Sequence, residues 1–200
     1  MNKNETKSKS GTVIEGLEVR QHDFPDILTF RSPVRSDIRG FVAPTYSKAF
    51  LGSLGIDFDV VHENHCLSPH IGTVRGFHYQ LPPFPQAKLI RVVRGRMMDV
   101  NVDMRRSSPT FGQHVAIELV AGDWDQIFVP GHYAHCYCTL EEDTEVVFKL
   151  GEGFAPDFTA GLAWNDPALG IDWPVSQDDA IVLERDLDRP SFHDVTALYP

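Results

Sequence analysis

The fold class of this chain is decided by the stretch Leu89-Ile-Arg-Val-Val-Arg-Gly-Arg-Met-Met-Asp-Val-Asn-Val-Asp-Met104. Apolar and often β-branched residues lie on both sides of a turn at Gly95, which predicts two strands, 89–93 and 97–104, joined as a hairpin. Successive side chains of a strand point to opposite faces. One face of the second strand therefore carries polar groups and the other is apolar. The polar groups are Asp99, Asn101 and Asp103.

Short strands separated by turn residues are expected along most of the 200-residue chain. The further segments with strand character are residues 13–19, 40–46, 60–65, 73–80, 114–119, 124–129, 135–140 and 144–150. Many short strands at this spacing predict an antiparallel barrel or a double-sheet jelly roll. Residues 47–54 are the best helix candidate, and no usable periodicity follows Ile181. We expect one domain, residues 13–200, after a mobile polar tail at residues 1–12.

Composition narrows the class of protein. Apolar content of 42% and charged content of 23% are typical of a globular protein, and a net charge of −10 argues against nucleic acid as a partner. No apolar run is long enough to span a membrane, and no secretory signal is visible. Three cysteines without such a signal favour a reducing, cytoplasmic location, and two of them, Cys136 and Cys138, are expected to pack on one strand face.

Arg75-Gly-Phe-His-Tyr-Gln80 is the stretch with the clearest chemistry. His78 and Gln80 alternate with two aromatic residues, so the polar pair faces one way, into a barrel mouth or toward solvent. Lys88 shares a face of the next strand with two apolar residues. A neutral imidazole can remove a proton beside a carbonyl, and an ammonium group can stabilise the resulting oxyanion. The alternatives are a hydrogen-bonded structural histidine and a solvated lysine at the start of a strand.

An imidazole that acts as a base needs its other nitrogen oriented, usually by a carboxylate. The sequence leaves four candidates open for His78: Asp99, Asp103, Asp166 and Asp186. Arg39 and Arg75 are candidate phosphate ligands, because guanidinium groups bind phosphate through two hydrogen bonds. Surface ion pairing is the alternative for both. No P-loop, G-x-G-x-x-G or G-x-S-x-G motif occurs, so a nicotinamide dehydrogenase or a serine hydrolase is poorly supported.

A metal site is also poorly supported. His135 follows a Pro-Gly turn, an arrangement similar to the second metal motif of cupin barrels. In the first metal motif a second histidine would stand where Gln80 is, and an acidic residue where Lys88 is. A cation at the site opposes binding of a divalent metal, so we expect a barrel without its metal.

Eight motifs share their order and spacing with one known family. They are Asp37-Ile-Arg-Gly-Phe41, Asn64-His65, Val74-Arg-Gly-Phe-His-Tyr-Gln80, Lys88-Leu-Ile-Arg91, Asp99-Val-Asn-Val-Asp103, Ser108-Pro-Thr-Phe-Gly112, Val129-Pro-Gly-His-Tyr-Ala-His135 and Trp164-Asn-Asp-Pro-Ala-Leu-Gly-Ile-Asp-Trp-Pro174. From about residue 13 to about residue 192 the chain resembles the dTDP-4-dehydrorhamnose 3,5-epimerase family. The resemblance implies an all-β, cupin-type double-stranded β-helix, or jelly roll, with few short helices. It also implies a homodimer, without metal or organic cofactor, that acts on a nucleotide-linked 4-keto-6-deoxy sugar.

The resemblance also implies roles for particular residues. His78 matches the base that removes the proton beside the keto group, Asp186 the aspartate that pairs with it, and Lys88 the lysine that stabilises the enolate. Arg75 matches a residue of the substrate pocket. Arg39 matches an arginine that reaches the nucleotide from the partner subunit.

Four further residues are expected around the substrate. His135 and Asp99 match a second polar pair inside the barrel, and Gln80 and Asn64 belong to motifs expected to line the substrate pocket.

Two positions depart from the family pattern. Phe148 stands where the family has a catalytic tyrosine, the proposed acid at C5, and phenylalanine has no exchangeable proton. Pro44 stands where the family usually has a glutamate near the nucleotide, which leaves the choice of nucleotide open. Because Phe148 cannot supply the proton at C5, we expect a single-centre epimerase acting at C3. The alternatives are a full 3,5-epimerase, a sugar-nucleotide-binding barrel without activity, and a metal-dependent cupin isomerase or oxygenase.

Overall fold

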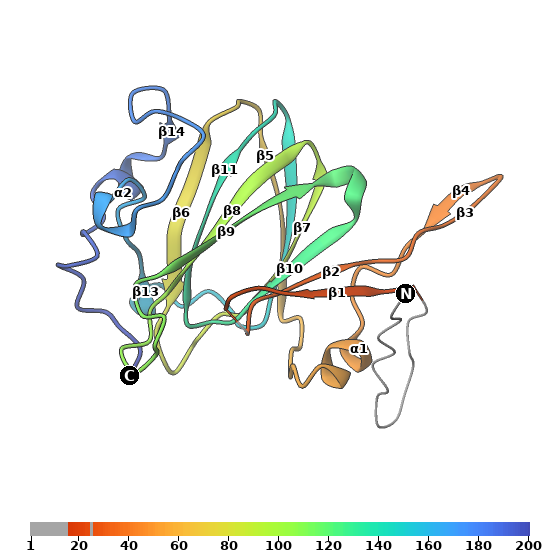
Figure 1. Ribbon diagram of the computed structural model, residues 1–200, viewed down its shortest axis with the longest axis horizontal. Coiled ribbons are helices and arrows are strands. Elements are labelled where there is room, and N and C mark those ends of the chain that lie inside the picture. The colour runs from red at the N-terminus through yellow and green to blue at the C-terminus, as the bar shows by residue number, and fades with distance from the viewer. Residues whose placement is uncertain (1–15, 25) are drawn as a thin grey trace.

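The computed structural model describes residues 16–24 and 26–200 and contains two large, mostly antiparallel sheets that face each other as a jelly roll (Figure 1). The first sheet has the order β1 (Glu18–Gln21), β2 (Leu28–Arg31), β10 (Asp125–Val129), β7 (Lys88–Arg94), β12 (Thr144–Leu150) and β5 (His62–Ser68). The second has the order β13 (Thr159–Ala160), β6 (Thr73–Gln80), β11 (Tyr133–Thr139), β8 (Arg96–Asp103) and β9 (His114–Val120), with β14 (Ile181–Val182) parallel to β6.

The remaining elements lie outside the two sheets. They are the hairpin β3 (Arg35–Asp37) and β4 (Gly40–Val42), the helices α1 (Lys48–Ser53) and α2 (Glu184–Leu187), and the 3-10 turns η1 (Ala121–Asp123), η2 (Pro156–Phe158) and η3 (Pro167–Leu169). Figure 1 shows the β3–β4 hairpin extending away from the barrel. No helix among residues 16–24 and 26–200 is long and apolar enough to cross a membrane.

The all-β prediction is confirmed, and strands 73–80 and 144–150 have the predicted bounds. The helix predicted at 47–54 is α1, which begins after Ser47 because the serine hydroxyl accepts a hydrogen bond from the Phe50 amide. The strand predicted at 13–19 begins only at Glu18, and residues 13–15, like the tail at 1–12, lie outside the described residues. The strand predicted at 40–46 ends at Val42.

The hairpin predicted at 89–104 is wrong, although both of its strands exist. β7 pairs with β10 and β12 in the first sheet, whereas β8 pairs with β11 and β9 in the second. Gly95 has a φ of +73°, and a Cβ there would lie 2.5 Å from the Thr144 hydroxyl oxygen. The chain therefore crosses between the sheets at this glycine. Alternation predicts a strand but does not identify the strand with which it pairs.

Both faces of β8 are buried, for different reasons. Val100 and Val102, together with Met104 just after the strand, pack beneath the C-terminal segment, in a cluster that includes Trp164 and Tyr199. The predicted packing of Cys136 and Cys138 is confirmed in this cluster. The polar face, expected from alternation, turns toward the space between the sheets, and its three side chains are fully buried. The C-terminal segment thus covers the second sheet and brings α2 alongside β6.

Candidate active site

A cavity of about 570 Å³ lies between the two sheets and is lined by strands of both, together with α2. The acidic and basic side chains that line it are mostly basic: Arg75, His78, Lys88, His135, Arg185, Asp186 and Arg189. A group of cations in a protein with a net charge of −10 is a local exception to the charge of the whole chain. Such a lining favours an anionic ligand.

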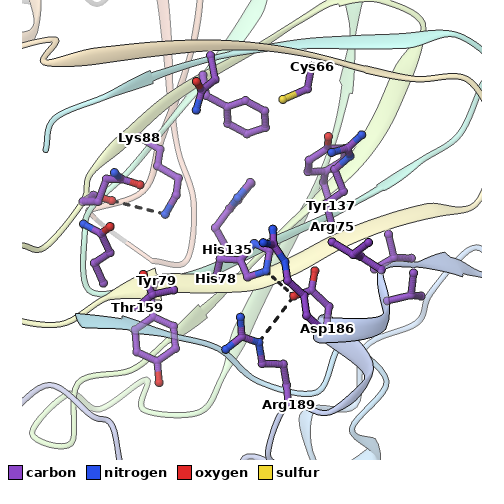
Figure 2. Close-up of a pocket in the computed structure, with 18 of the residues that line it drawn as sticks. Cys66, Arg75, His78, Tyr79, Lys88, His135, Tyr137, Thr159, Asp186 and Arg189 are labelled. Carbon is purple, nitrogen blue, oxygen red and sulfur yellow. Dashed lines mark hydrogen bonds and ion pairs between the residues drawn. The ribbon is translucent and has the colours of Figure 1, made fainter. Parts of the chain in front are cut away.

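His78 extends from β6 into this cavity and pairs with Asp186 of α2 (Figure 2). Its Nε2 lies 2.8 Å from the Asp186 Oδ1, so Nε2 carries the proton and Nδ1 has the free lone pair. The histidine side chain is 34% exposed, whereas that of the aspartate is only 4% exposed. Burial alone would raise the pKa of Asp186, but the hydrogen bond from His78 and two nearby arginines bring it below its ordinary value. Asp186 therefore stays ionised and orients the imidazole.

The other three candidate carboxylates are engaged elsewhere. Asp99 accepts a hydrogen bond from His135, and Asp103 accepts hydrogen bonds from Arg105. Asp166 accepts hydrogen bonds from two backbone amides, those of residues 168 and 192. The structure thus selects Asp186, which lies in the segment that showed no periodicity, as the partner of His78.

Lys88 is buried at the start of β7, so the alternative of a solvated lysine is wrong. Its ammonium has one long hydrogen bond within the described part of the chain, 3.5 Å to the Gln86 carbonyl oxygen. Burial lowers the pKa of Lys88 to about 8, and the carboxylate of Asp99 limits the fall. A desolvated ammonium with so little internal compensation is well placed to stabilise an anion that forms in the cavity.

A second histidine–aspartate pair lies directly beside the first. His135 on β11 is the cross-strand partner of His78, and its Nε2 lies 2.7 Å from Oδ2 of Asp99. Burial lowers the pKa of His135, although Asp99 acts in the opposite direction. Asn101 donates a hydrogen bond of 2.6 Å to the other oxygen of Asp99. His135 lines the cavity, whereas Asp99 is fully buried behind it.

Arg75 and His78 both line the cavity although they are three residues apart on β6. Regular alternation would put them on opposite faces. The register between β6 and β11 shifts here, because Tyr137 is opposite Arg75 while His135 is opposite His78. This bulge places one extra residue on β6 and turns both side chains inward.

The remaining predicted residues divide into two groups. Asn64 and Phe148 line the cavity, and so does Gln80, but its amide is engaged by the backbone of residues 84, 153 and 155. Arg39 does not line it: it lies between β3 and β4, with its side chain 83% exposed and paired with Asp37.

Two cavity arginines were not predicted. Arg185 and Arg189 flank Asp186 in the C-terminal segment, and nothing in their local pattern distinguishes them from surface arginines.

The chain is similar in sequence to known proteins of one family. The family model for dTDP-4-dehydrorhamnose 3,5-epimerase matches residues 21–194. An enzyme of that name from Sinorhizobium fredii is 35% identical over 181 residues, which cover 90% of this chain and 92% of the relative.

Solved structures show the same similarity. A dTDP-4-dehydrorhamnose 3,5-epimerase from Bacillus anthracis, crystallised with TDP and PPi, has a TM-score of 0.84 and 37% identity, over 88% of this chain and 99% of the other. The 3'-monoepimerase ChmJ from Streptomyces bikiniensis, crystallised with dTDP-quinovose, has a TM-score of 0.79 and 30% identity, over 86% of each chain. The chain therefore belongs to the dTDP-4-dehydrorhamnose 3,5-epimerase family and is a carbohydrate epimerase.

Proposed function

We propose that this enzyme inverts C3 of a nucleotide-diphosphate 4-keto-6-deoxyhexose through an enolate. The observation that carries the proposal is an oriented imidazole, His78 on Asp186, in the same cavity as a buried, poorly compensated ammonium, Lys88. A proton beside a ketone is acidic enough for a positioned imidazole, and the reaction needs no redox step.

The chemistry follows from these positions. His78 Nδ1 takes the proton from C3, and the electron pair of the broken C–H bond forms a C3–C4 double bond. The carbonyl π pair moves to O4, where the Lys88 ammonium stabilises the negative charge. Because the pKa of Lys88 is about 8, most of this lysine is charged at neutral pH. Asp186 stabilises the imidazolium that forms and holds the ring in position.

The basic lining supports a diphosphate as the anionic part of the substrate. Arg75, Arg185 and Arg189 are all cavity residues, and guanidinium groups suit phosphate oxygens. The similar enzymes from Bacillus anthracis and Streptomyces bikiniensis were crystallised with TDP and with a dTDP-sugar. We therefore favour dTDP as the nucleotide.

Restriction to C3 is proposed from Phe148. Inversion needs deprotonation on one face of the carbon and protonation on the other, and Phe148 has no proton to give. The alternative is a full 3,5-epimerase in which another group supplies the C5 proton. A second alternative is a binding protein without turnover.

NMR in D₂O with the dTDP-4-keto-6-deoxyglucose substrate distinguishes the C3 epimerase from the two alternatives. We expect deuterium at C3 with inversion and retention of hydrogen at C5. Stoichiometric inversion at C5 would establish the full 3,5-epimerase instead, and binding without any exchange would establish the inactive barrel. Phe148→Tyr should gain inversion at C5 if this position alone limits the reaction.

A homodimer that shares residues between sites is part of the proposal. It is supported by the position of Arg39 on a hairpin that extends from the barrel and exposes apolar Ile38, Phe41 and Val42. Mixing Arg39→Ala protein with His78→Ala protein should restore part of the activity, because one hybrid site regains both residues. A fully active monomer in light scattering would contradict the shared site.

A further inference from the structure

Gln80 lies at the end of β6, two residues beyond His78, and its side chain lines the cavity. The residue is only 3% exposed. Its Nε2 donates hydrogen bonds of 2.9 Å to Phe84 O and 3.0 Å to Gly153 O. Its Oε1 accepts a hydrogen bond of 2.9 Å from the Ala155 amide. Both N–H groups of the Gln80 side chain are therefore used inside the protein, and neither is left for a substrate.

The hydrogen bonds to Gly153 and Ala155 hold the backbone on both sides of Phe154. Gly153 O belongs to the peptide group before Phe154, and the Ala155 N–H belongs to the peptide group after it. Peptide groups are planar, so one side-chain amide fixes the orientation of both planes. The Ala155 carbonyl oxygen is held as well, by a hydrogen bond of 3.2 Å from the Thr159 hydroxyl. The backbone of Phe154 is thus fixed mainly by one buried side chain.

Gln80 also connects this segment to the loop between β6 and β7, through its hydrogen bond to Phe84 O. Gln86, in the same loop, donates a hydrogen bond of 2.8 Å to Glu152 O. The two loops are therefore joined twice, once through each glutamine. The segment that carries Phe154 is anchored to the loop as well as to the strand.

The side chain of Phe154, in contrast, is 73% exposed although it lines the cavity. It therefore lies at the edge of the cavity, with its backbone held in place before any ligand arrives. A group that is already ordered loses little conformational entropy when a ligand packs against it. We propose that Gln80 is a positioning residue, which holds Phe154 at the cavity edge so that the ring contacts the nucleotide-linked substrate. This inference rests on the proposed function, because it concerns the same substrate in the same cavity.

The test measures the Kd of dTDP by calorimetry. Gln80→Met nearly keeps the length of the side chain but removes all three of its hydrogen bonds, whereas Phe154→Ala removes the ring. Each should raise the Kd by about 3- to 10-fold, the range for one aromatic contact. The double variant should bind no more weakly than Phe154→Ala, because Gln80 acts through that ring.

Gln126→Met is the matched control. Gln126 is 1% exposed and donates a hydrogen bond of 2.8 Å to the Ser32 hydroxyl, outside the cavity lining. Both glutamine variants should have a lower Tm, because buried groups lose their partners. Only Gln80→Met should weaken dTDP binding. With the 4-keto sugar substrate, Gln80→Met should raise KM more than it lowers kcat.

Three results would overturn the role of Gln80: wild-type affinity in Gln80→Met, equal weakening in Gln126→Met, or additive losses in the double variant. A fall in kcat with unchanged KM would also overturn it, because Gln80 would then act on His78. If Gln80→Met does not fold, Gln80→Glu replaces it, since the carboxylate can accept from the Ala155 amide but cannot donate to either carbonyl.

The same measurements separate this inference from the function on which it rests. A wild-type protein that binds dTDP but exchanges no proton at C3 would overturn the proposed reaction and leave the role of Gln80 in place. A wild-type protein that does not bind dTDP would overturn the proposed nucleotide, and the inference with it.

Discussion

The two histidine–aspartate pairs of the barrel have nearly the same geometry and very different surroundings. The N–O distance is 2.8 Å in the His78–Asp186 pair and 2.7 Å in the His135–Asp99 pair. The His78 side chain is 34% exposed, whereas that of His135 is only 5% exposed. A base must exchange its proton with substrate and solvent, which only the first pair can do readily. Both histidines line the cavity, so neither hydrogen-bond geometry nor position identifies the catalytic pair; the exposure of the imidazole does.

The largest expected effect is that of His78→Asn. Loss of the base should slow C3 exchange by about 10²–10⁴-fold. The Tm should stay close to that of the wild type, because asparagine can still donate to Asp186. In the other pair, His135→Ala removes the donor altogether and should lose about 3 kcal/mol of folding free energy, because the fully buried Asp99 would be left without that hydrogen bond. Exchange rates in D₂O and thermal denaturation measure both. If folded His78→Asn turned over as fast as the wild type, His78 would not be the base, and the distinction between a catalytic and a structural pair would be wrong.

Asp186→Asn should have the next largest effect. The amide can hold His78 in the wrong tautomer, so that the free nitrogen no longer faces the substrate. Loss of an orienting aspartate costs roughly 10⁴-fold in serine proteases, and we expect a smaller loss here because the imidazole still reaches the cavity. The decrease should be in kcat, with KM little changed, as steady-state kinetics would show. An increase in KM alone would mean that Asp186 acts in binding.

Lys88→Met should lower kcat by about 10²–10³-fold with little change in KM, since the oxyanion exists fully only after deprotonation. The same variant should raise the Tm, because it replaces a buried, poorly compensated charge with an apolar side chain. Kinetics and thermal denaturation of one preparation test both parts. If substrate affinity alone fell, Lys88 would be a phosphate ligand instead.

The smallest expected effect is on the pH profile. Since burial lowers the pKa of Lys88 to about 8, kcat/KM should fall as the pH rises through that value and the ammonium is lost. Asp99 opposes the lowering of this pKa, so Asp99→Asn should shift the fall to lower pH. Profiles of kcat/KM report on the free enzyme and are the measurement to use. A profile that stays flat above pH 8 would contradict a role for the Lys88 charge.

The local sequence pattern predicted the strands that carry the site, but it did not predict how these strands pair. The alternation around His78 correctly predicted that the polar and aromatic residues face opposite ways, and Phe77 and Tyr79 belong to the core. The passage of the chain from one sheet to the other at Gly95 could not be predicted from the sequence, because the partner of a strand depends on residues far away in the chain. The bulge that turns Arg75 inward is likewise a property of two paired strands, β6 and β11.

The cavity itself was only partly predictable. The resemblance to a family identified Asp186, whereas the residues alone left four carboxylates open. Arg185 and Arg189 enter the cavity because the C-terminal segment folds back over β6, and that path leaves no periodic pattern in the sequence. The depth at which Lys88 is buried also depends on this three-dimensional packing.

The large sequence separation between His78 and Asp186 also bears on when this pair forms during synthesis of the protein. His78 and Asp186 are 108 residues apart, and all strands from β1 to β12 precede α2 in the chain. Proteins are made from the N-terminus, and contacts of large sequence separation tend to form late. The nascent barrel would thus carry an unoriented His78 until α2 is made and docks. A chain that stops before α2 has the base but not its partner, so the imidazole of His78 is oriented only after residue 186 has been added.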